Sequence, residues 1–236
     1  MGKIYTALGL MSGTSMDGVD ASIIQSDGES KYKSILDKYL EYPENIYNNL
    51  TILRDKIKNS KDLKKHQKLI KSAEKEVTLF HAKAVNNLIN DINIDTDFIG
   101  FHGQTIFHNA EEKITVQLGN GKLLSQLTKK KVVYDFRQND LKNDGQGAPL
   151  TPIFHKMLAK KLNLKNATFI NIGGIINQTS IFDDGVFQAH DLGPGMCLID
   201  KWIRTKSKKK YDDKGNLARS GKVNQKISDE AKRKWM

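Results

Sequence analysis

The sequence has a single cysteine, Cys197, only four prolines, and no apolar run near the ~20 residues that a membrane-spanning helix requires. One cysteine excludes an internal disulfide framework and is typical of a reducing compartment. The first residues, MGKIYTALGL, do not form a signal peptide with a cleavage site. No Pro-rich or Ser-rich run indicates disorder. We therefore expect a soluble, cytoplasmic chain with no membrane partner.

Acidic residues are in deficit, with 27 Asp and Glu against 38 Lys and Arg, which gives a formal net charge of +11. Such a charge attracts polyanions, so a basic nucleic-acid-binding module is one alternative. The charge is carried mainly by lysine runs at 64–65, 129–131 and 206–210. None has the aromatic interleaving of a base-stacking surface, and no zinc-finger or recognition-helix motif accompanies them. We interpret the runs as solvated surface and expect no specific nucleic-acid partner.

The 236 residues, 38% of them hydrophobic, can form one large or two small globular domains. Residues 3–11, 19–25 and 32–40 are predicted to be strands, and their short connections favour an antiparallel meander. Apolar spacings of three and four predict a helix after Pro43 and another over 70–88. Further predicted elements are a short buried strand in 97–105 that ends in a polar loop, strands at 114–118 and 132–136, and helices at 121–130 and 149–162.

The same pattern then restarts. A strand at 168–172 ends at Gly173-Gly174, a hairpin surrounds residues 183–185, and a helix is predicted over 197–205. The apolar side chains of that helix share one side, and they are Leu198, Ile199 and Trp202. This weak repeat of architecture predicts two stacked lobes, 1–162 and 163–236, with a glycine-rich hairpin of each facing a cleft that suits the phosphates of a nucleotide. A helix predicted from Ser228 stops in mid-pattern, so we expect the second lobe to be truncated.

The turn between the first two strands carries a candidate phosphate loop, made of Gly13, Thr14, Ser15, Met16, Asp17, Gly18, Val19 and Asp20. Glycines let a backbone approach a phosphate, hydroxyls donate to its oxygens, and a carboxylate can hold Mg²⁺. A tight hairpin with no ligand would use the same residue types. The loop is neither a Walker P-loop nor a G-x-G-x-x-G fingerprint.

Two further polar clusters follow predicted strands. His102-Gly103-Gln104-Thr105 ends the strand in 97–105, where polar side chains tend to point into a cleft. No Cys or acidic partner lies at metal-binding spacing, and a structurally hydrogen-bonded histidine is the alternative. Arg137 lies in the polar loop after the strand predicted at 132–136, and its guanidinium could bind an acidic ligand group through a bidentate contact. A loop salt bridge between Arg137 and Asp140 is the alternative interpretation there.

Asp191 precedes a Gly-Pro-Gly turn that leads into the helix at 197–205. A carboxylate at that point could be a general base, a Mg²⁺ ligand or a helix cap, and the residues themselves leave all three open.

Seven segments in order resemble the signature blocks of the anhydro-N-acetylmuramic acid kinase family. They are GLMSGTSMDGVDASI, GFHGQTIFH, VQLGN, DFRQND…GQGAPLTPIFH, FINIGGIINQTSI, DLGPGMCLIDKW and GNLARSGKVN. The resemblance covers essentially the whole chain. It implies an α/β protein with the ribonuclease-H-like actin/Hsp70/sugar-kinase fold, in which the first lobe is nearly complete and the second partial.

The resemblance also implies a reaction. The family opens the 1,6-anhydro ring of anhydro-N-acetylmuramic acid with ATP and water, giving N-acetylmuramic acid 6-phosphate in peptidoglycan recycling. Asp191 would activate the water, Gly13 to Asp20 would form the first phosphate loop, and Gly173 and Gly174 would belong to the second. Mg²⁺ would bridge the phosphates. The sugar side would be lined by His102, Gln104, Arg137 and Asp140. The resemblance also implies that the full-length protein could form a homodimer.

Three departures from the family pattern bear on activity. Met196 stands where the family usually has Asn, which removes an amide donor beside Asp191. Gln178 stands where an apolar residue is more usual. The family's C-terminal Gly-Gly-Gly adenosine motif has no counterpart in this sequence. An inactive, truncated remnant of the kinase is therefore the alternative to an active enzyme.

Overall fold

The computed structural model describes residues 2–92, 94–207 and 209–235. Its first three strands are β1 (Tyr5–Ser12), β2 (Gly18–Ser26) and β3 (Tyr32–Glu41). They pair as an antiparallel meander, as the sequence predicts. The β1–β2 turn is tight because Met16 adopts a positive φ of 61°. At Gly18 any side chain would collide with the backbone carbonyl of Leu40 on β3.

Helices α1 (Glu44–Lys56), α2 (Ser60–Lys65) and α3 (Gln67–Ile92) carry the chain to β4 (Phe98–Asn109), which pairs with β1 in parallel. The next elements are β5 (Ile114–Leu118), α4 (Gly121–Thr128) and β6 (Lys131–Tyr134). The first half of β4 pairs in parallel with β6 and the second half pairs antiparallel with β5. The sheet order is therefore β3-β2-β1-β4, with β5 and β6 together on the far edge of β4.

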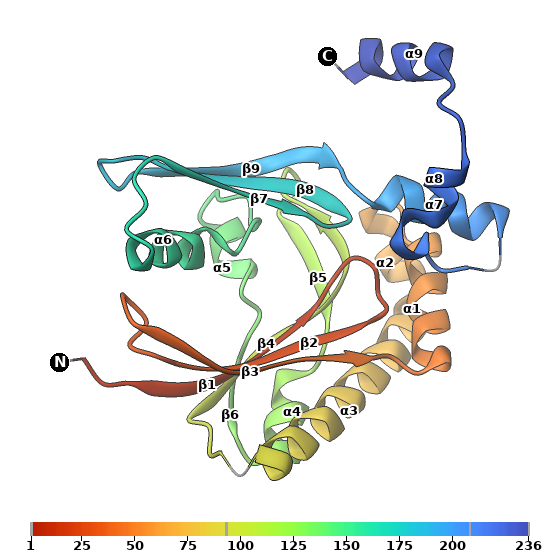
Figure 1. Ribbon diagram of the computed structural model, residues 1–236. Coiled ribbons are helices and arrows are strands. Elements are labelled where there is room, and N and C mark those ends of the chain that lie inside the picture. The colour runs from red at the N-terminus through yellow and green to blue at the C-terminus, as the bar shows by residue number, and fades with distance from the viewer. Residues whose placement is uncertain (1, 93, 208, 236) are drawn as a thin grey trace.

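The main hydrophobic core lies between this sheet and the long helix α3 (Figure 1). The buried face of α3 repeats at spacings of three and four, as its sequence requires. Its members are Ala73, Val77, Thr78, His81, Ala82, Ala84, Val85 and Leu88. They meet β-strand side chains such as Leu8 and Phe101, which are 0% and 1% exposed. This core fixes the position of the β1–β2 turn.

A second sheet has the order β7-β8-β9 and is wholly antiparallel. Its strands are β7 (Ala167–Ile172), β8 (Ile175–Ile181) and β9 (Phe187–Pro194), and it follows α5 (Gln138–Lys142) and α6 (Pro152–Lys161). Helix α6 links the two sheets: His155 Nδ1 lies 2.9 Å from Thr179 Oγ1 on β8, and Lys161 Nζ donates to Tyr32 O on β3 at 3.1 Å. Figure 1 shows the second sheet lying over the first with α6 between them.

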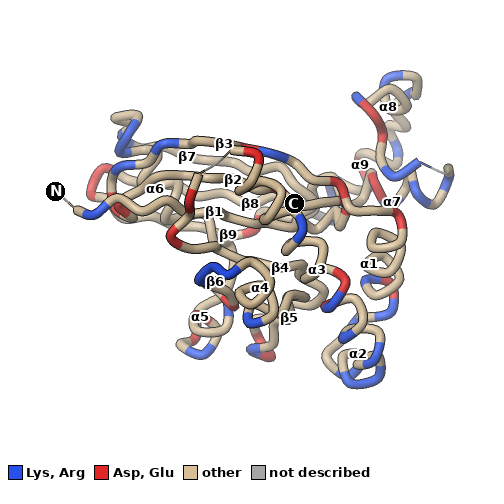
Figure 2. Tube along the Cα trace, turned by 90° about the horizontal axis from the view of Figure 1, so that it is seen from below, with Lys and Arg blue, Asp and Glu red and all other residues tan. Residues whose placement is uncertain are grey.

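The chain continues through α7 (Cys197–Lys206), a 3₁₀ turn (Asp213–Gly215), α8 (Asn216–Ser220) and α9 (Gln225–Trp235). In Figure 1 α7 and α8 stand beside α1, whereas α9 extends away from the body. Figure 2 shows basic positions spread over several helices rather than gathered on one element. Lys208, in the third lysine run, lies outside the described residues. Across the described ranges we find no helix with the length and apolarity to span a bilayer.

Several predictions of local structure were wrong. The segment from His102 to Thr105 lies inside β4 rather than in a loop after it, because the second half of the strand has its own partner in β5. The hairpin around 183–185 has longer strands than predicted, and the last helix begins at Gln225 rather than Ser228. The predicted apolar side of α7 is exposed, with Leu198 57% and Trp202 61% accessible, and the buried residue of that helix is Ile203.

Candidate active site between the two sheets

The loop from Gly13 to Asp17 is held from below by a buried polar cluster. Gln104, which is 0% exposed, donates through Nε2 to Gly13 O at 2.9 Å, and its Oε1 lies 2.7 Å from Ser12 Oγ. Ser12 Oγ also lies 2.9 Å from Gly18 O and 3.0 Å from Tyr42 OH. These contacts join the two ends of the loop to the middle of β4. Gln104 thus supports the loop in this structure, and its predicted contact with a sugar stays a prediction.

Two carboxylates lie at and after the end of the same loop, Asp17 in its last position and Asp20 on β2. The pKa of Asp20 is raised, first by burial and then by the negative charge of Asp17. Burial and the charge of Asp17 also raise the pKa of Tyr39. Burial raises the pKa of Asp200 on α7 too; Arg204 opposes this rise and Asp17 adds to it. The charge of Asp17 therefore influences groups that follow both sheets: Asp20 and Tyr39 on the first sheet, and Asp200 on the helix after the second. Within the described residues no three His, Cys, Asp or Glu side chains form a metal-binding group.

The glycine hairpin of the second sheet meets the first loop directly. A Cβ atom at Gly174 would collide with Thr14 Oγ1. The turn after β9 folds onto the same hairpin, because Gly195 N donates to Gly174 O at 2.9 Å and Met196 N donates to Gly173 O at 2.9 Å. A Cβ atom at Gly195 would strike the backbone carbonyl of Gly173. Close approach to backbone therefore requires glycine at position 195, whereas at position 174 the obstacle is the Thr14 side chain.

Arg137 and His102 form one hydrogen-bonded unit. Arg137 donates through Nε at 3.2 Å and Nη2 at 2.9 Å to His102 Nε2, and through Nη1 at 2.6 Å to Gly147 O. His102 Nδ1 lies 2.7 Å from Gly103 O. Burial, and next the charge of Arg137, lower the pKa of His102 to about 4, so the ring is neutral and accepts from the guanidinium. A guanidinium has five N–H donors, which leaves two of them for a ligand.

Asp140 does not pair with Arg137 but holds the loop whose carbonyl accepts from Arg137. Its Oδ2 accepts a hydrogen bond of 2.6 Å from Gly147 N, the residue whose carbonyl accepts from Arg137. Gly147 has a φ of +66°, a conformation that favours glycine. His108 Nε2 lies 3.0 Å from Gln146 O and holds the same loop. Among the ion pairs of the described residues there is no salt bridge between Arg137 and Asp140, so that alternative interpretation is wrong.

Asp191 lies on β9 of the second sheet, and its charge influences Arg137. The ladder between β8 and β9 shifts register between Ile176 and Asn177, so that Leu192 is the extra residue of a β-bulge next to Asp191. Bulges re-aim the side chains beside them. Asp191 is exposed, and its negative charge counteracts the lowering of the pKa of Arg137 and of His108. The N-cap of α7 is Met196, which excludes a capping role for Asp191.

A smaller cavity of about 240 Å³ opens beside His102. It is lined by Phe101, His102, Thr115, Val116, Gln117, Gly119, Tyr134, Asp135 and Gln138. The sequence interpretation singled out only His102 among them. It also missed Ser12 and Tyr42, although Ser12 directly precedes the glycine loop and could have been included with it. Nothing in the local sequence marks Tyr42, because its partner is 30 residues away.

The fold and site together define a class. A meander of three strands extended by parallel strands, and a second meander whose glycine hairpin meets that of the first, make this an α/β protein of two sheets that meet at their glycine hairpins. Within that class the chain belongs to the anhydro-N-acetylmuramic acid kinase family, whose sequence model matches residues 5–234.

Named relatives agree with this assignment. The chain is 53% identical over 234 residues to the anhydro-N-acetylmuramic acid kinase of Pelagibacter ubique, covering 98% of this chain and 62% of that protein. It is 41% identical to the enzyme of the same name from Agrobacterium fabrum, covering 94% and 61%. The chain thus spans about three fifths of the length of the curated relatives it matches. Among solved structures, an Aquifex aeolicus member of the Ppx/GppA family is similar with a TM-score of 0.40 at 12% identity, covering 84% of this chain and 54% of that one.

Proposed function

We propose that the protein represented by this chain uses ATP and water to open the anhydro ring of 1,6-anhydro-N-acetylmuramic acid and to phosphorylate it at O6. Family membership supports the reaction, and one electrostatic observation supports the site. The negative charge of the exposed Asp191, on the second sheet, counteracts the lowering of the pKa of Arg137 and of His108. A base on β9 and a cation at the start of α5 suit a water attack beside a sugar that carries a carboxylate.

In this proposal Asp191 accepts the proton of the attacking water. The water oxygen bonds to the anomeric carbon, the bond from that carbon to O6 breaks, and O6 then bonds to the γ-phosphorus as ADP leaves. A positioned base contributes ~10²–10⁴-fold to such a step. Arg137, with two guanidinium N–H groups free of the contacts described above, would bind the lactyl carboxylate of the sugar. His102 and Asp140 would hold Arg137 and the loop at 145–147 in register for that contact.

The two glycine hairpins would hold the phosphates of ATP. Their backbone N–H groups, together with Thr14, supply hydrogen-bond donors where the hairpins touch. Ser15 Oγ donates to Asp17 Oδ1 at 2.5 Å in this structure and would exchange that partner for a phosphate oxygen. Mg²⁺ in nucleotide sites uses one or two carboxylates in addition to phosphate oxygens and water, and Asp17 and Asp20 are carboxylates close enough for one to raise the pKa of the other. They fit a metal that would neutralise phosphate charge. We also propose the division into lobes at 1–162 and 163–236, cytoplasmic action on a small sugar without specific nucleic-acid binding, and homodimerisation.

The test is sugar-dependent ADP release, measured with and without 1,6-anhydro-N-acetylmuramic acid. Three samples are compared: this chain, this chain mixed with the remaining two fifths of the Pelagibacter ubique relative, and that relative alone. Asp191→Asn is expected to remove ~10²–10⁴-fold of the turnover. It should leave the unfolding midpoint unchanged, because the side chain is exposed and its amide replacement is isosteric. Turnover that survives the substitution would remove Asp191 from the role of base.

A further inference from the structure

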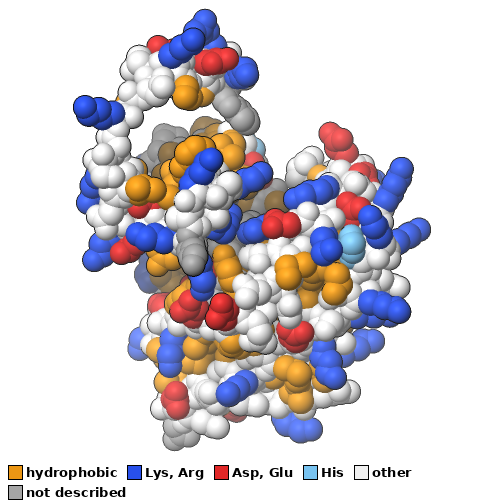
Figure 3. All heavy atoms as spheres, turned by 90° about the vertical axis from the view of Figure 1, so that its right-hand side faces the viewer, with side chains coloured by type: hydrophobic (Ala, Val, Ile, Leu, Met, Phe, Trp, Pro, Cys, Tyr) orange, Lys and Arg blue, Asp and Glu red, His pale blue; other side chains and the backbone are white. Residues whose placement is uncertain are grey.

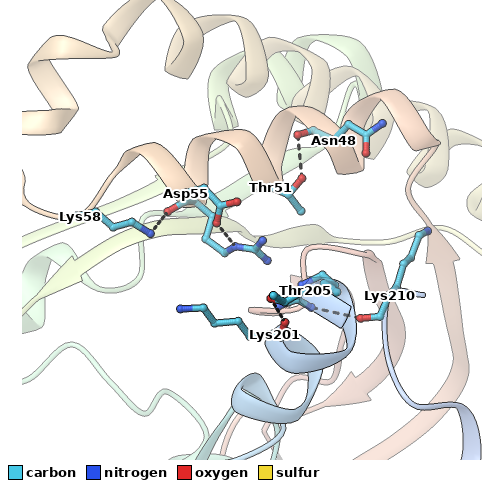
Figure 4. Close-up of polar contacts among 9 residues, drawn as sticks. Asn48, Thr51, Asp55, Lys58, Lys201, Thr205 and Lys210 are labelled. Atoms are coloured by element: carbon cyan, nitrogen blue, oxygen red, sulfur yellow. Dashed lines mark hydrogen bonds and ion pairs between the residues drawn. The ribbon is translucent and has the colours of Figure 1, made fainter. Parts of the chain in front are cut away.

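Helices α1 and α7 enclose a groove of about 690 Å³ that plays no part in the proposed reaction. Its lining residues come from α1 and from α7 with the segment that follows it, and they are Tyr47, Thr51, Arg54, Asp55, Lys58, Cys197, Leu198, Lys201, Arg204, Thr205, Ser207, Lys209 and Lys210. Figure 4 shows side chains of the two helices lying across from one another. Figure 3, which faces this side of the molecule, shows Lys and Arg side chains around hydrophobic patches.

The lining is strongly cationic. Six of its residues are Lys or Arg, and a single residue, Asp55, is acidic. Arg54 is paired with Asp55 at 3.2 Å and Lys210 with Glu41 at 3.1 Å. Among the ion pairs of the described residues, the other four cations have no carboxylate partner, and they are Lys58, Lys201, Arg204 and Lys209. Like charges held around one concavity repel each other and raise the local concentration of anions.

The serine and threonine hydroxyl groups of the lining already donate to backbone carbonyls and are not free to donate to an anion. Thr51 donates to Asn48 O at 2.9 Å, Thr205 to Lys201 O at 2.7 Å, and Ser207 to Ile203 O at 2.8 Å. Anion recognition then falls mainly to the ammonium and guanidinium groups, with the Tyr47 hydroxyl as a further donor. Guanidinium forks match phosphate oxygens, and lysine binds phosphate as a point charge. The volume lies in the range of small-molecule sites and exceeds that of one phosphate group, so an occupant with several phosphoryl groups fits best.

We propose that the groove binds a linear polyphosphate, free or carried by a nucleoside, which bridges Arg54 and Lys58 of α1 to Lys201 and Arg204 of α7. Helix α1 follows the last strand of the first meander, and α7 follows the last strand of the second. The bound polyanion therefore clamps the two sheets together from the side opposite α6. This site does not depend on the proposed kinase reaction, since the four cations that would contact the ligand are none of the residues assigned to the sugar or to the hairpins. The lining residue Cys197 adjoins the second hairpin, where its N–H donates to Gly174 O at 3.3 Å.

The single cysteine provides a local probe, because Cys197 lines the groove and is the only thiol in the chain. We would measure the rate of its alkylation by iodoacetamide at low ionic strength while tripolyphosphate is added. At ten times the dissociation constant the rate should fall about tenfold, as mass action requires. ATP and a Glu-rich peptide are tested in parallel. Protection by tripolyphosphate alone indicates a free polyphosphate, and equal protection by ATP indicates a nucleoside polyphosphate.

Two variants test the bridge independently. Lys201→Gln with Arg204→Gln, and Arg54→Gln with Lys58→Gln, should each weaken protection at least tenfold. The control, Lys226→Gln with Arg233→Gln on α9, removes the same charge outside the groove and should change it less than twofold. Equal losses in all three would assign binding to diffuse charge, and protection only by the Glu-rich peptide would assign the groove to a polypeptide. Protection that both groove variants retain but Gly174→Ala abolishes would assign the ligand to the hairpins. Each of these outcomes overturns the proposal.

Discussion

Replacing Gln104 by leucine tests whether the glycine loop depends on the buried polar cluster beneath it. The substitution keeps the size of the side chain and removes three contacts: Nε2 to Gly13 O at 2.9 Å, Nε2 to Thr105 O at 3.3 Å, and Oε1 to Ser12 Oγ at 2.7 Å. Each hydrogen bond contributes about 1 kcal/mol net. Gly13 O, left without this partner, costs about 1 kcal/mol more. The buried leucine returns about 2 kcal/mol of apolar transfer, so the expected loss of unfolding free energy is about 2 kcal/mol.

Urea denaturation measures that loss. With a slope of about 3 kcal/mol/M, the midpoint of Gln104→Leu should fall by about 0.7 M. Gln117→Leu is the matched control: it lies on the neighbouring strand β5 and its Nε2 also makes two contacts, at 3.2 Å and 2.7 Å, but it is half-buried. Water replaces its lost hydrogen bonds, and its cost should stay below about 1 kcal/mol. Hydrogen exchange at the amides of 13–18 should rise about 30-fold in Gln104→Leu.

A double-mutant cycle with Ser12→Ala isolates the direct contact. Ser12 is 1% exposed and shares its hydroxyl between Gly18 O, Tyr42 OH and Gln104. Buried partners in one network usually couple by about 0.5–3 kcal/mol. Equal losses for Gln104→Leu and Gln117→Leu, together with a coupling energy near zero, would refute the argument that Gln104 fixes the loop.

Three other substitution sets follow from the same structure. Arg137→Ala should raise KM for the sugar in turnover assays. It should also raise the pKa of His102 above about 4, because the charge of Arg137 is the second cause of that low value. If the two side chains are not in contact, NMR titration of the ring protons should give the same pKa for His102 in the variant and the parent. The folded pKa of His102 lies below the ordinary 6.5, so the unfolded state binds a proton first and stability should fall by on the order of 2–3 kcal/mol as pH drops from 6.5 to about 4. Replacing His102 by Gln should flatten that slope in denaturation curves, and an unchanged slope would contradict the assignment. Gly195→Ala should lower the melting temperature more than Gly174→Ala, because its new Cβ atom strikes the backbone carbonyl of Gly173. The Cβ atom of Gly174→Ala meets only the Thr14 side chain, so adding Thr14→Ala should relieve that clash. If calorimetry shows the larger loss for Gly174→Ala, the hairpins are spaced differently.

Much of the architecture was predictable because it depends on near neighbours along the chain. The alternation in the first three strands and their short turns specify a meander, and the three-four spacing in 70–88 specifies the buried face of α3. The prediction failed at β4, where the polar run from His102 to Thr105 resembles a loop. Those side chains are tolerated inside a strand because distant groups satisfy them, such as Gly13 O, 91 residues from Gln104.

The sequence by itself determined the order of the elements, the two glycine hairpins and the family, because these follow from local residue types in a fixed order. It left Asp191 open among base, ligand and cap, and gave Arg137 and Asp140 the alternative of a salt bridge. Only the tertiary structure excluded the cap and the salt bridge, and the role of Asp191 as base stays a prediction. The tertiary structure made Met196 the cap of α7, directed Arg137 to His102, and brought the α1 and α7 cations around one groove. The physical reason is that a polar or charged side chain takes its role from the groups that packing brings within a few ångströms, and these are remote in the sequence.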